Sequence, residues 1–214
     1  MPADAVLGLP RTTIDGLCAP GGTIVVIGSD PKEELGALYL RIRHAVVNDG
    51  ATLIEIVPRR TGLSEIATHT LVHAPGAVAE VAAALVGSTP VAGDDVGGVP
   101  ADALTAAIET LSDAVPKVLL GRGNLADAAA LTVAAATTIL DARPGTEFLS
   151  GLRRGNVHGA LDMGLAPGLL PGRVTLDDGR GPFHEVWSTV PTADGLAAAG
   201  TLQAAAEGKV DVLV

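Results

Sequence analysis

The chain has 214 residues, of which 48% are hydrophobic and only 2% aromatic, so its core must be built mainly from Ala, Val, Leu and Ile. The formal net charge of -10 repels phosphate backbones and anionic lipid, and aromatic side chains for stacking bases are scarce. We therefore expect no nucleic-acid partner. The single cysteine, Cys18, excludes an internal disulfide, a Cys-based zinc site and an iron–sulfur cluster ligated within this chain, and it favours a reducing compartment.

Residues 1–22 contain glycine and proline without a regular hydrophobic period, and we treat them as a lead-in to the first strand. No run of about 18 apolar residues occurs that could cross a bilayer. We therefore expect no direct insertion into a membrane.

The stretch from Thr23 to Arg59 predicts a strand, a helix and a second strand. Its first apolar run, residues 23–27, is short and mostly β-branched, which is typical of a strand buried on both faces of a parallel sheet. After a turn at 28–31, in which Asp30 can cap the helix, apolar residues recur at helical spacing over 35–46. Residues 53–57 are again β-branched. Because parallel strands joined by a helix form α/β sheets, the unit predicts a Rossmann-like fold with any ligand at the carboxyl ends of the strands.

Further along the chain the same kinds of element recur. The pattern predicts a third strand at Thr70–Val72, followed by a helix at about Ala77–Val86. A surface loop at Gly87–Pro100 then leads to a second helix at Leu104–Leu111. A second strand–turn–helix unit follows, with a strand at Lys117–Leu120, a glycine turn at 121–124 and a helix at Leu125–Leu140. We therefore place a domain boundary near Val115.

The last third of the chain is predicted to hold a long loop from Asp141 to Gly181, a helix from Leu196 to Glu207 and a final strand from Lys209 to Val214. We expect that strand to lie beside Val118–Leu120. The predicted fold is thus α/β, with two Rossmann-like subdomains of mainly parallel sheet. They span residues 23–115 and 116–214, and the second is expected to be incomplete at its C-terminal end.

The glycine turns at Gly28 and at Gly121-Arg122-Gly123 stand where a Rossmann-like sheet presents backbone amides to phosphate. Neither completes the dinucleotide fingerprint of three spaced glycines, so ordinary strand-to-helix turns remain an alternative. Arg59, Arg60, Arg153 and Arg154 flank loops that could face one cleft. They suit phosphate binding or pairing with carboxylates equally well.

Metal binding and nucleophilic catalysis lack a supporting pattern. His69 and His73 are four residues apart, but in a strand-like stretch where that spacing does not bring them onto one metal. His158 and His184 lie in long loops without a spaced carboxylate or cysteine. Cys18 has no basic neighbour to lower its pKa, so a spectator thiol is the simpler interpretation.

Several motifs together resemble a known family. They are Gly28-Ser29-Asp30-Pro31, Leu40-Arg41-Ile42-Arg43-x-Ala45, Gly50-Ala51, Pro58-Arg59-x-Thr61, Pro75-Gly76, the run Arg154 to Gly164 and Leu170-Pro171-Gly172. In this order they resemble the middle of the molybdopterin oxidoreductase superfamily, over about residues 23–214. Leu40–Arg43 and the run Gly164–Gly172 are most similar to the large iron–sulfur subunit of respiratory complex I, the NADH-quinone oxidoreductase.

The resemblance implies two Rossmann-like domains like the middle domains of formate dehydrogenase and DMSO reductase, which in active relatives clasp a molybdopterin guanine dinucleotide. Carried onto this chain, the cleft comprises Gly28, Ser29, Asp30, Arg59, Thr61, Gly121, Asn156 and His158. The resemblance further implies that the iron–sulfur clusters lie elsewhere in the parent subunit, with no cofactor in this segment. Its partners would be the rest of that subunit and other complex I subunits, on the cytoplasmic face of the cell membrane.

Three motifs depart from those of the active members of the superfamily. Val57 stands where they commonly carry an aspartate before the Pro-Arg pair, Ala77 and Val78 replace a Thr-Asp pair, and His158 replaces a glutamine. Each loss of a polar partner for a buried guanosine costs on the order of 1–3 kcal/mol. The sequence therefore favours a non-catalytic scaffold and subunit interface that retains the cleft in vestigial form. The alternatives are the pterin-dinucleotide portion of an active molybdenum enzyme and a free-standing nucleotide-binding module.

We predict that the purified chain carries neither molybdenum nor iron, because it has one cysteine and lacks the superfamily's metal-ligating segment. Elemental analysis after chelation and gel filtration checks this. Near-stoichiometric metal that survives both steps would overturn the scaffold interpretation.

Overall fold

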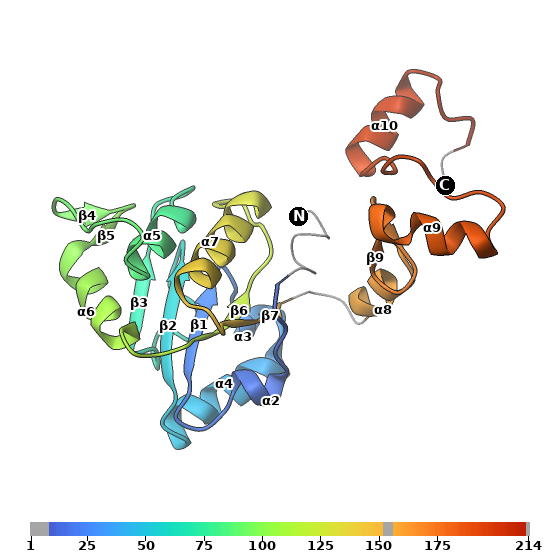
Figure 1. Cartoon of the computed structure of the whole chain (residues 1–214). Helices are drawn as coiled ribbons and strands as arrows, with labels where there is room; N and C mark the ends of the chain where they lie inside the picture. Colours follow the sequence, from blue (N-terminus) through green and yellow to red (C-terminus); the bar gives the residue numbers. More distant parts are fainter. Residues whose placement is uncertain (1–8, 152–155, 213–214) are drawn as a thin grey trace. The chain divides into compact units, whose positions relative to one another are not determined.

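The computed structural model describes residues 9–151 and 156–212, and the chain divides into two compact units, Met1–Arg153 and Arg154–Val214 (Figure 1). The first unit consists of three layers, with a parallel sheet between two layers of helices. The second unit is small and mainly helical. Each unit has buried hydrophobic residues of its own.

The sheet of the first unit has five parallel strands in the order β3-β2-β1-β6-β7. The strands are β1 (Thr23–Ile27), β2 (Thr52–Val57), β3 (His69–Val72), β6 (Lys117–Leu120) and β7 (Glu147–Ser150). In β1, Val25 pairs with Ile54 on one side and with Val118 on the other, and the four residues 24–27 are buried. The predicted parallel pairing of the first two strands is confirmed, and the fold is Rossmann-like α/β.

The boundary expected near Val115 does not separate two sheets. Strand β6, which the sequence pattern assigned to a second subdomain, pairs directly with β1, so both strand–turn–helix units share one sheet. The expected pairing of Lys209–Val214 with Val118–Leu120 is also wrong for the part described: β6 lies between β1 and β7, and residues 209–212 form no strand. Residues 213 and 214 lie outside the described residues.

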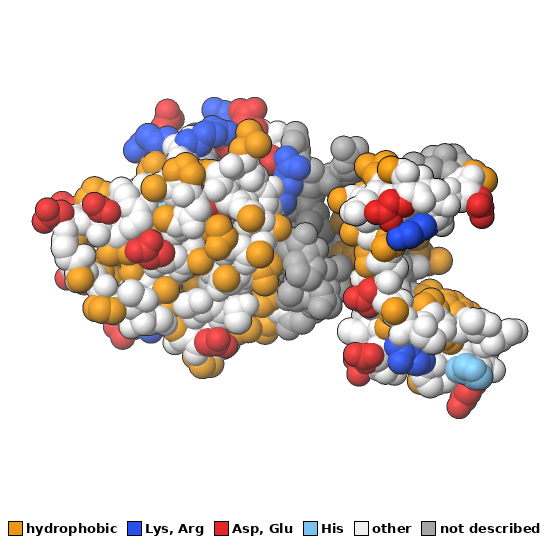
Figure 2. All heavy atoms as spheres, turned by 90° about the horizontal axis from the view of Figure 1, so that it is seen from above, with side chains coloured by type: hydrophobic (Ala, Val, Ile, Leu, Met, Phe, Trp, Pro, Cys, Tyr) orange, Lys and Arg blue, Asp and Glu red, His pale blue; other side chains and the backbone are white. Residues whose placement is uncertain are grey.

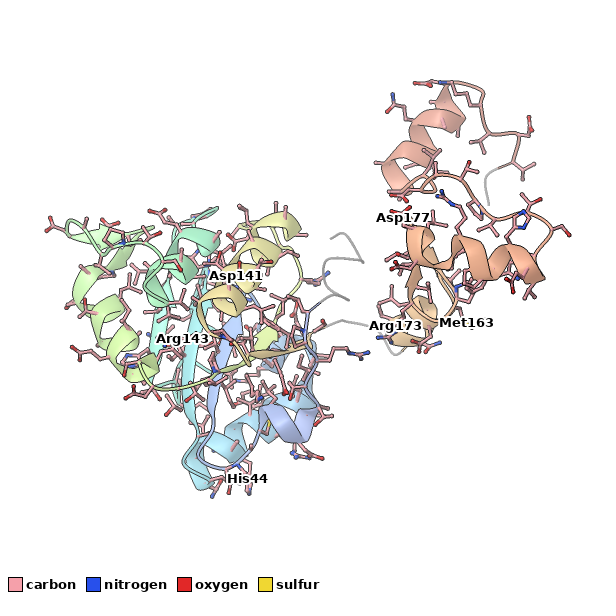
Figure 3. All side chains as sticks on the ribbon, viewed as in Figure 1. His44, Asp141, Arg143, Met163, Arg173 and Asp177 are labelled. Atoms are coloured by element: carbon pink, nitrogen blue, oxygen red, sulfur yellow. The ribbon has the colours of Figure 1, made fainter. Side chains whose placement is uncertain are left out.

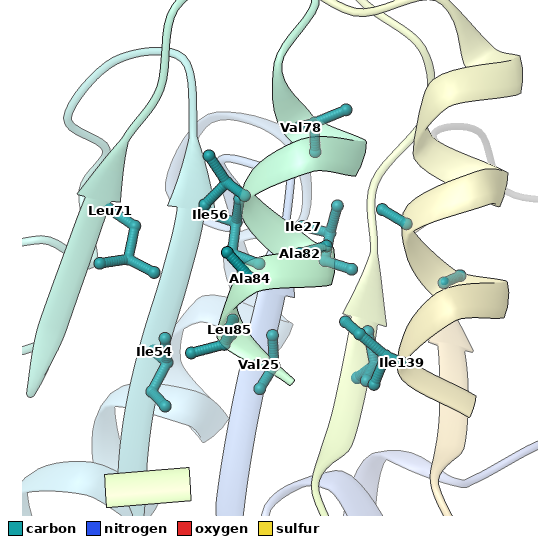
Figure 4. Packing of buried hydrophobic residues seen from close by; sticks show 14 of the residues in the cluster. Val25, Ile27, Ile54, Ile56, Leu71, Val78, Ala82, Ala84, Leu85 and Ile139 are labelled. Carbon is teal, nitrogen blue, oxygen red and sulfur yellow. The ribbon is translucent and has the colours of Figure 1, made fainter. Parts of the chain in front are cut away.

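Helices cover both faces of the sheet because its strands are apolar on both faces. On one face, α4 (Gly36–Asn48) and α2 (Ile14–Leu17) bury Leu38, Ile42 and Leu17 against Ile24 and Leu53. On the other face lie α5 (Val78–Leu85), α6 (Ala101–Leu111) and α7 (Ala129–Ala142). Figure 4 shows the packing of this second face, with side chains of α5 and α7 set against those of β1, β2 and β3.

Local turns set where two of the predicted helices begin. After the short helix α3 (Pro31–Glu34), Leu35 has a non-helical backbone (φ -144°, ψ 65°), and α4 (Gly36–Asn48) begins at the next residue. Asp30 occupies the N-cap position of α3, but its side chain makes no capping bond and instead accepts the Gly62 N–H. Helix α7 starts at Ala129 rather than at Leu125. The side-chain Oδ1 of Asn124 accepts the N–H groups of Ala126 and Asp127 and so closes a turn before the helix.

The described part of the lead-in is integrated into the first unit. Phe148 of β7 donates its N–H to Pro10 O at 2.7 Å and accepts the Thr12 N–H at 3.0 Å, which sets this segment parallel to β7. Leu17 of α2 is almost fully buried. Residues 9–22 therefore contribute to the sheet edge and to the core.

The stretch predicted as a long loop, Asp141–Gly181, is largely structured. It contains the end of α7, the edge strand β7, α8 (Val157–Asp162), β8 (Leu169–Leu170), β9 (Val174–Thr175) and the start of α9 (Leu176–Val186). The hydrophobic periodicity of the sequence did not predict these elements, because they are short and lie in a glycine-rich stretch. The loop expected at 87–100 likewise holds a small hairpin of β4 (Asp95–Val96) and β5 (Val99–Pro100).

The second unit has a small core, in which Leu170, Leu176 and Val190 are buried. The helix expected at 196–207 is confirmed as α10 (Ala198–Ala206), although none of its residues is buried. Among the residues that the structure describes, no helix has the length and apolar character needed to cross a membrane.

We predict that Ile42→Ala destabilises the chain by about 2–5 kcal/mol, because Ile42 is fully buried between α4 and the sheet. The matched control is Leu40→Ala on the same helix, where the side chain is 63% exposed and the change should stay within about 0.5 kcal/mol. Urea unfolding followed by circular dichroism measures both. Equal effects of the two substitutions would contradict this packing of α4.

Candidate functional site

A cavity of about 440 Å³ lies at the carboxyl edge of the sheet in the first unit. Segments that follow four of the strands line it, namely Gly28–Asp30 with Glu34 after β1, Val57–Arg59 with Thr61 after β2, Pro75 after β3 and Asn124–Ala126 after β6. The strand order reverses between β1 and β6, and ligands of open α/β sheets bind at such a point. Its location makes the cavity the candidate functional site.

Two glycines at this edge are required by the backbone. Gly28 has a φ of +61°, in the left-handed region that other residues rarely adopt. A Cβ on Gly121 would lie 2.5 Å from Ile27 O and 2.6 Å from Gly28 O. The backbones of the two turns therefore approach each other at the base of the cavity.

The amides of these glycines are not free to bind a ligand. The Gly28 N–H donates to Ile56 O at 3.0 Å and the Gly121 N–H donates to Ile27 O at 2.7 Å. Both bonds extend the ladder of the parallel sheet by one residue. These two amides are therefore not available to phosphate, and ordinary strand-to-helix turns were the alternative that the sequence left open.

Carboxylates contribute much of the charge that lines the cavity. Asp30 Oδ2 lies 3.4 Å from Arg59 Nη2, and Asp30 Oδ1 accepts the Gly62 N–H at 3.3 Å. Glu34 accepts a hydrogen bond from Ser29 Oγ at 3.3 Å and lies 3.5 Å from Arg122 Nε. The two arginines are thus already paired with carboxylates of the same chain. Figure 2 views the molecule from this end and shows acidic and basic side chains close together along one margin of the first unit.

A fully buried carboxylate, Glu55, holds the loop that supplies Arg59 and Thr61. It accepts hydrogen bonds from the hydroxyls of Thr61, Ser64 (2.7 Å) and Thr70 (3.1 Å). The hydroxyl proton of Thr61 is therefore directed to Glu55 rather than to the cavity. Three hydroxyl donors compensate the burial of this carboxylate.

Much of the remaining lining of the cavity is apolar. Val57 is buried at the end of β2, and Pro58, Pro75 and Ala126 add further apolar surface. Leu125 is fully exposed at the same cavity. The cavity thus combines an apolar wall with internally paired charges.

The structure brings together five of the eight site residues predicted from the sequence: Gly28, Ser29, Asp30, Arg59 and Thr61 line the cavity. Gly121 packs closely against the backbone of Gly28 but does not itself line the cavity. Asn156 belongs to the second unit, where it precedes α8. The His158 side chain, Arg153 and Arg154 lie outside the described residues.

Two of the remaining histidines, His44 and His69, and the cysteine lie away from the cavity. His44 lies on α4, at the other end of the first unit from the carboxyl edge, with Nδ1 3.0 Å from Asp49 Oδ2 (Figure 3). His69 Nε2 lies 2.7 Å from Thr110 Oγ1, and burial lowers the pKa of His69. Burial raises the pKa of the Cys18 thiol, which keeps it protonated and unreactive. Within residues 9–151 and 156–212, no cluster of three or more metal-ligating side chains occurs.

Sequence reasoning missed Glu55, Asn124 and Leu125 as parts of the site. Glu55 had a visible signal, since it is a single carboxylate within the β-branched run 53–57 and must find donors when buried. Asn124 and Leu125 had none, because their position depends on β6 joining the first sheet.

No protein-family model matches the chain, and no curated protein matches it.

The residues at the cavity do not fit the pyrophosphate of a dinucleotide. The Gly28 and Gly121 amides are used within the sheet, Arg59 and Arg122 face carboxylates, and Asp30 and Glu34 would repel phosphate. Val57 ends β2 where dinucleotide-binding folds place an acidic residue for the ribose hydroxyls. Two amides and two guanidinium groups near the cavity are thus already engaged within the chain, and two carboxylates oppose an anion there.

We predict that Glu55→Ala lowers the free energy of unfolding by about 3 kcal/mol, since it leaves the buried Ser64 hydroxyl and the partly buried hydroxyls of Thr61 and Thr70 without their acceptor. Glu55→Gln should cost about half as much, because hydroxyls can also accept from the new amide. Urea unfolding measures both, with the exposed Glu65→Gln as the control. A neutral Glu55→Ala would show that the carboxylate does not hold this loop.

Proposed function

We propose that this chain is a segment of a complex I iron–sulfur subunit, in which it serves as scaffold and subunit interface and supports electron transfer from NADH to quinone through clusters located elsewhere. Its partners are the rest of that subunit and neighbouring subunits of the complex. The complex places it at the cytoplasmic face of the cell membrane. The motifs from Gly28-Ser29-Asp30-Pro31 to Leu170-Pro171-Gly172 support the family assignment.

The observation that carries the non-catalytic role is that two backbone amides at the edge of the cleft donate hydrogen bonds within the sheet. In a nucleotide-binding Rossmann-like fold, the turn after the first strand offers amides to phosphate. Here Gly28 and Gly121 donate to Ile56 O and Ile27 O instead. The use of these two amides within the sheet suits a domain that has kept its fold after losing its ligand.

The electrostatics of the cavity support the same conclusion. A bound dinucleotide would bring two or more negative charges next to Asp30 and Glu34, whose own cations, Arg59 and Arg122, are already paired. Replacing these internal pairs by phosphate would leave carboxylates without partners in a partly buried site, which is strongly unfavourable. The buried Val57 adds no polar contact for a ribose.

The alternative is the pterin guanine dinucleotide-binding portion of an active molybdenum oxidoreductase such as a formate dehydrogenase. One observation favours it: a cavity of about 440 Å³ is retained at the point of the sheet where such folds bind ligands. That volume lies within the range of small-molecule sites.

We predict that the parent subunit, purified from its native source, releases no guanine nucleotide on acid denaturation. Chromatography of the supernatant measures this, with a molybdenum-containing formate dehydrogenase treated in parallel as the positive control. Because the Gly28 and Gly121 amides serve the sheet and the carboxylates of Asp30 and Glu34 oppose a phosphate, the expected nucleotide content is far below one per chain. Stoichiometric guanine nucleotide would reject the scaffold role and establish the alternative.

A second outcome bears on the family itself. The parent gene should encode, upstream of this segment, cysteines in the spacing of iron–sulfur ligands. Their absence would reject the complex I assignment even if no nucleotide is found.

A further inference from the structure

Two buried polar atoms in the first unit face each other without satisfying hydrogen bonds. His73 Nε2 lies 3.5 Å from Asp127 Oδ2, and the two side chains are 0% and 2% exposed. Within the described residues, neither atom has a hydrogen-bond partner. Buried polar groups normally have partners, so the pair calls for an explanation.

The remaining contacts of the two side chains fix their orientation. His73 Nδ1 lies 2.9 Å from Ala74 O, an acceptor, so Nδ1 carries a proton. Asp127 Oδ1 accepts the Gly76 N–H at 3.2 Å, which leaves Oδ2 directed at the imidazole. If neither Nε2 nor Oδ2 carried a proton, two lone pairs would face each other in a buried site.

The contact joins two loops that are distant in the sheet. His73 directly follows β3, Asp127 follows β6, and strands β2 and β1 lie between them. The two loops lead into α5 and α7, which pack against each other. They also contribute Pro75 and Ala126 to the wall of the cavity.

We propose that a proton between His73 Nε2 and Asp127 Oδ2 turns this contact into a latch, which holds the loops after β3 and β6 together and fixes that wall. The hydrogen bond from the Gly76 N–H to the same carboxylate is the second contact that joins the two loops. The latch does not depend on what the cavity binds, so it stands apart from the proposed scaffold role.

Substitutions at Asp127 separate a latch from a repulsive contact. Asp127→Asn keeps an oxygen for the Gly76 N–H and places an N–H donor opposite Nε2, so the melting temperature should stay within about 3 °C of the native chain. Asp127→Ala removes both bonds and should lower it by roughly 6–12 °C. Thermal melts of the full chain measure both. If the native contact is repulsive, Asp127→Asn will instead raise the melting temperature by clearly more than about 3 °C.

A double-mutant cycle tests whether the two residues act together. His73→Ala with Asp127→Ala should lower the melting temperature hardly more than the worse single change, because either one opens the latch. The matched control is His69→Ala, which removes a histidine at the other end of β3 and should add fully to Asp127→Ala. Additive effects of His73 and Asp127 would overturn the proposal.

Hydrogen exchange supplies a local readout that general destabilisation does not imitate. In Asp127→Ala the Gly76 amide should exchange at least about tenfold faster, while the Thr52 amide, which donates to Gly22 O within the sheet, should not change under conditions that favour the folded state. Asp127→Asn should keep the Gly76 amide protected. Loss of that protection in the asparagine variant would also contradict the latch.

Discussion

The hydrogen bonds that two glycine amides make at the carboxyl edge of the sheet constrain the whole site. Gly28 N–H donates to Ile56 O and Gly121 N–H donates to Ile27 O, so the ladder joining β2, β1 and β6 continues one residue past each strand. The close approach of the two turns excludes any side chain at Gly121. These bonds anchor the loops above the sheet and also withdraw the amides from any ligand.

The charges around the cavity are likewise satisfied within the chain. Arg59, which on sequence grounds suited phosphate or carboxylate equally well, lies next to Asp30, and Arg122 lies next to Glu34. The Arg59 side chain is 69% exposed, so its ion pair with Asp30 adds little to stability. The pair nevertheless places a carboxylate next to the guanidinium group that a phosphate would need. The buried Glu55 has a different role, because its hydroxyl donors shape the loop that carries Arg59 and Thr61. A cleft with this arrangement keeps its form without needing a ligand.

Local patterns predicted local structure well. The β-branched runs at 23–27 and 53–57 correspond to β1 and β2, because these strands are buried along their length. The helical period of 35–46 corresponds to α4, because one face of that helix packs on the sheet throughout. The predictions that failed concerned pairing between segments that are distant in the sequence. Whether Lys117–Leu120 opens a new sheet or joins the old one depends on pairing with β1, which no residue in that run encodes. The edge strand β7 was missed for a similar reason, since it is short and stands in a glycine-rich stretch.

The difference between local and long-range contacts also explains which parts of the candidate site could be predicted. Five predicted residues line the cavity because they directly follow β1 and β2, whose adjacency was foreseen. Their hydrogen-bonding states were not predictable, since the partners Ile56 O, Gly62 N–H and Glu55 come from other parts of the chain. Asp30 illustrates this well: the sequence suited it to capping, yet the fold offered it the Gly62 N–H and Arg59.

The most direct test of the scaffold account is nuclear magnetic resonance of the ¹⁵N-labelled chain during titration with pyrophosphate. If the Gly28 and Gly121 amides serve the sheet, their resonances will not shift up to millimolar pyrophosphate, and both will be protected from hydrogen exchange. Saturable shifts of these two amides, with rapid exchange in the free chain, would show that they are available to phosphate and would contradict the account.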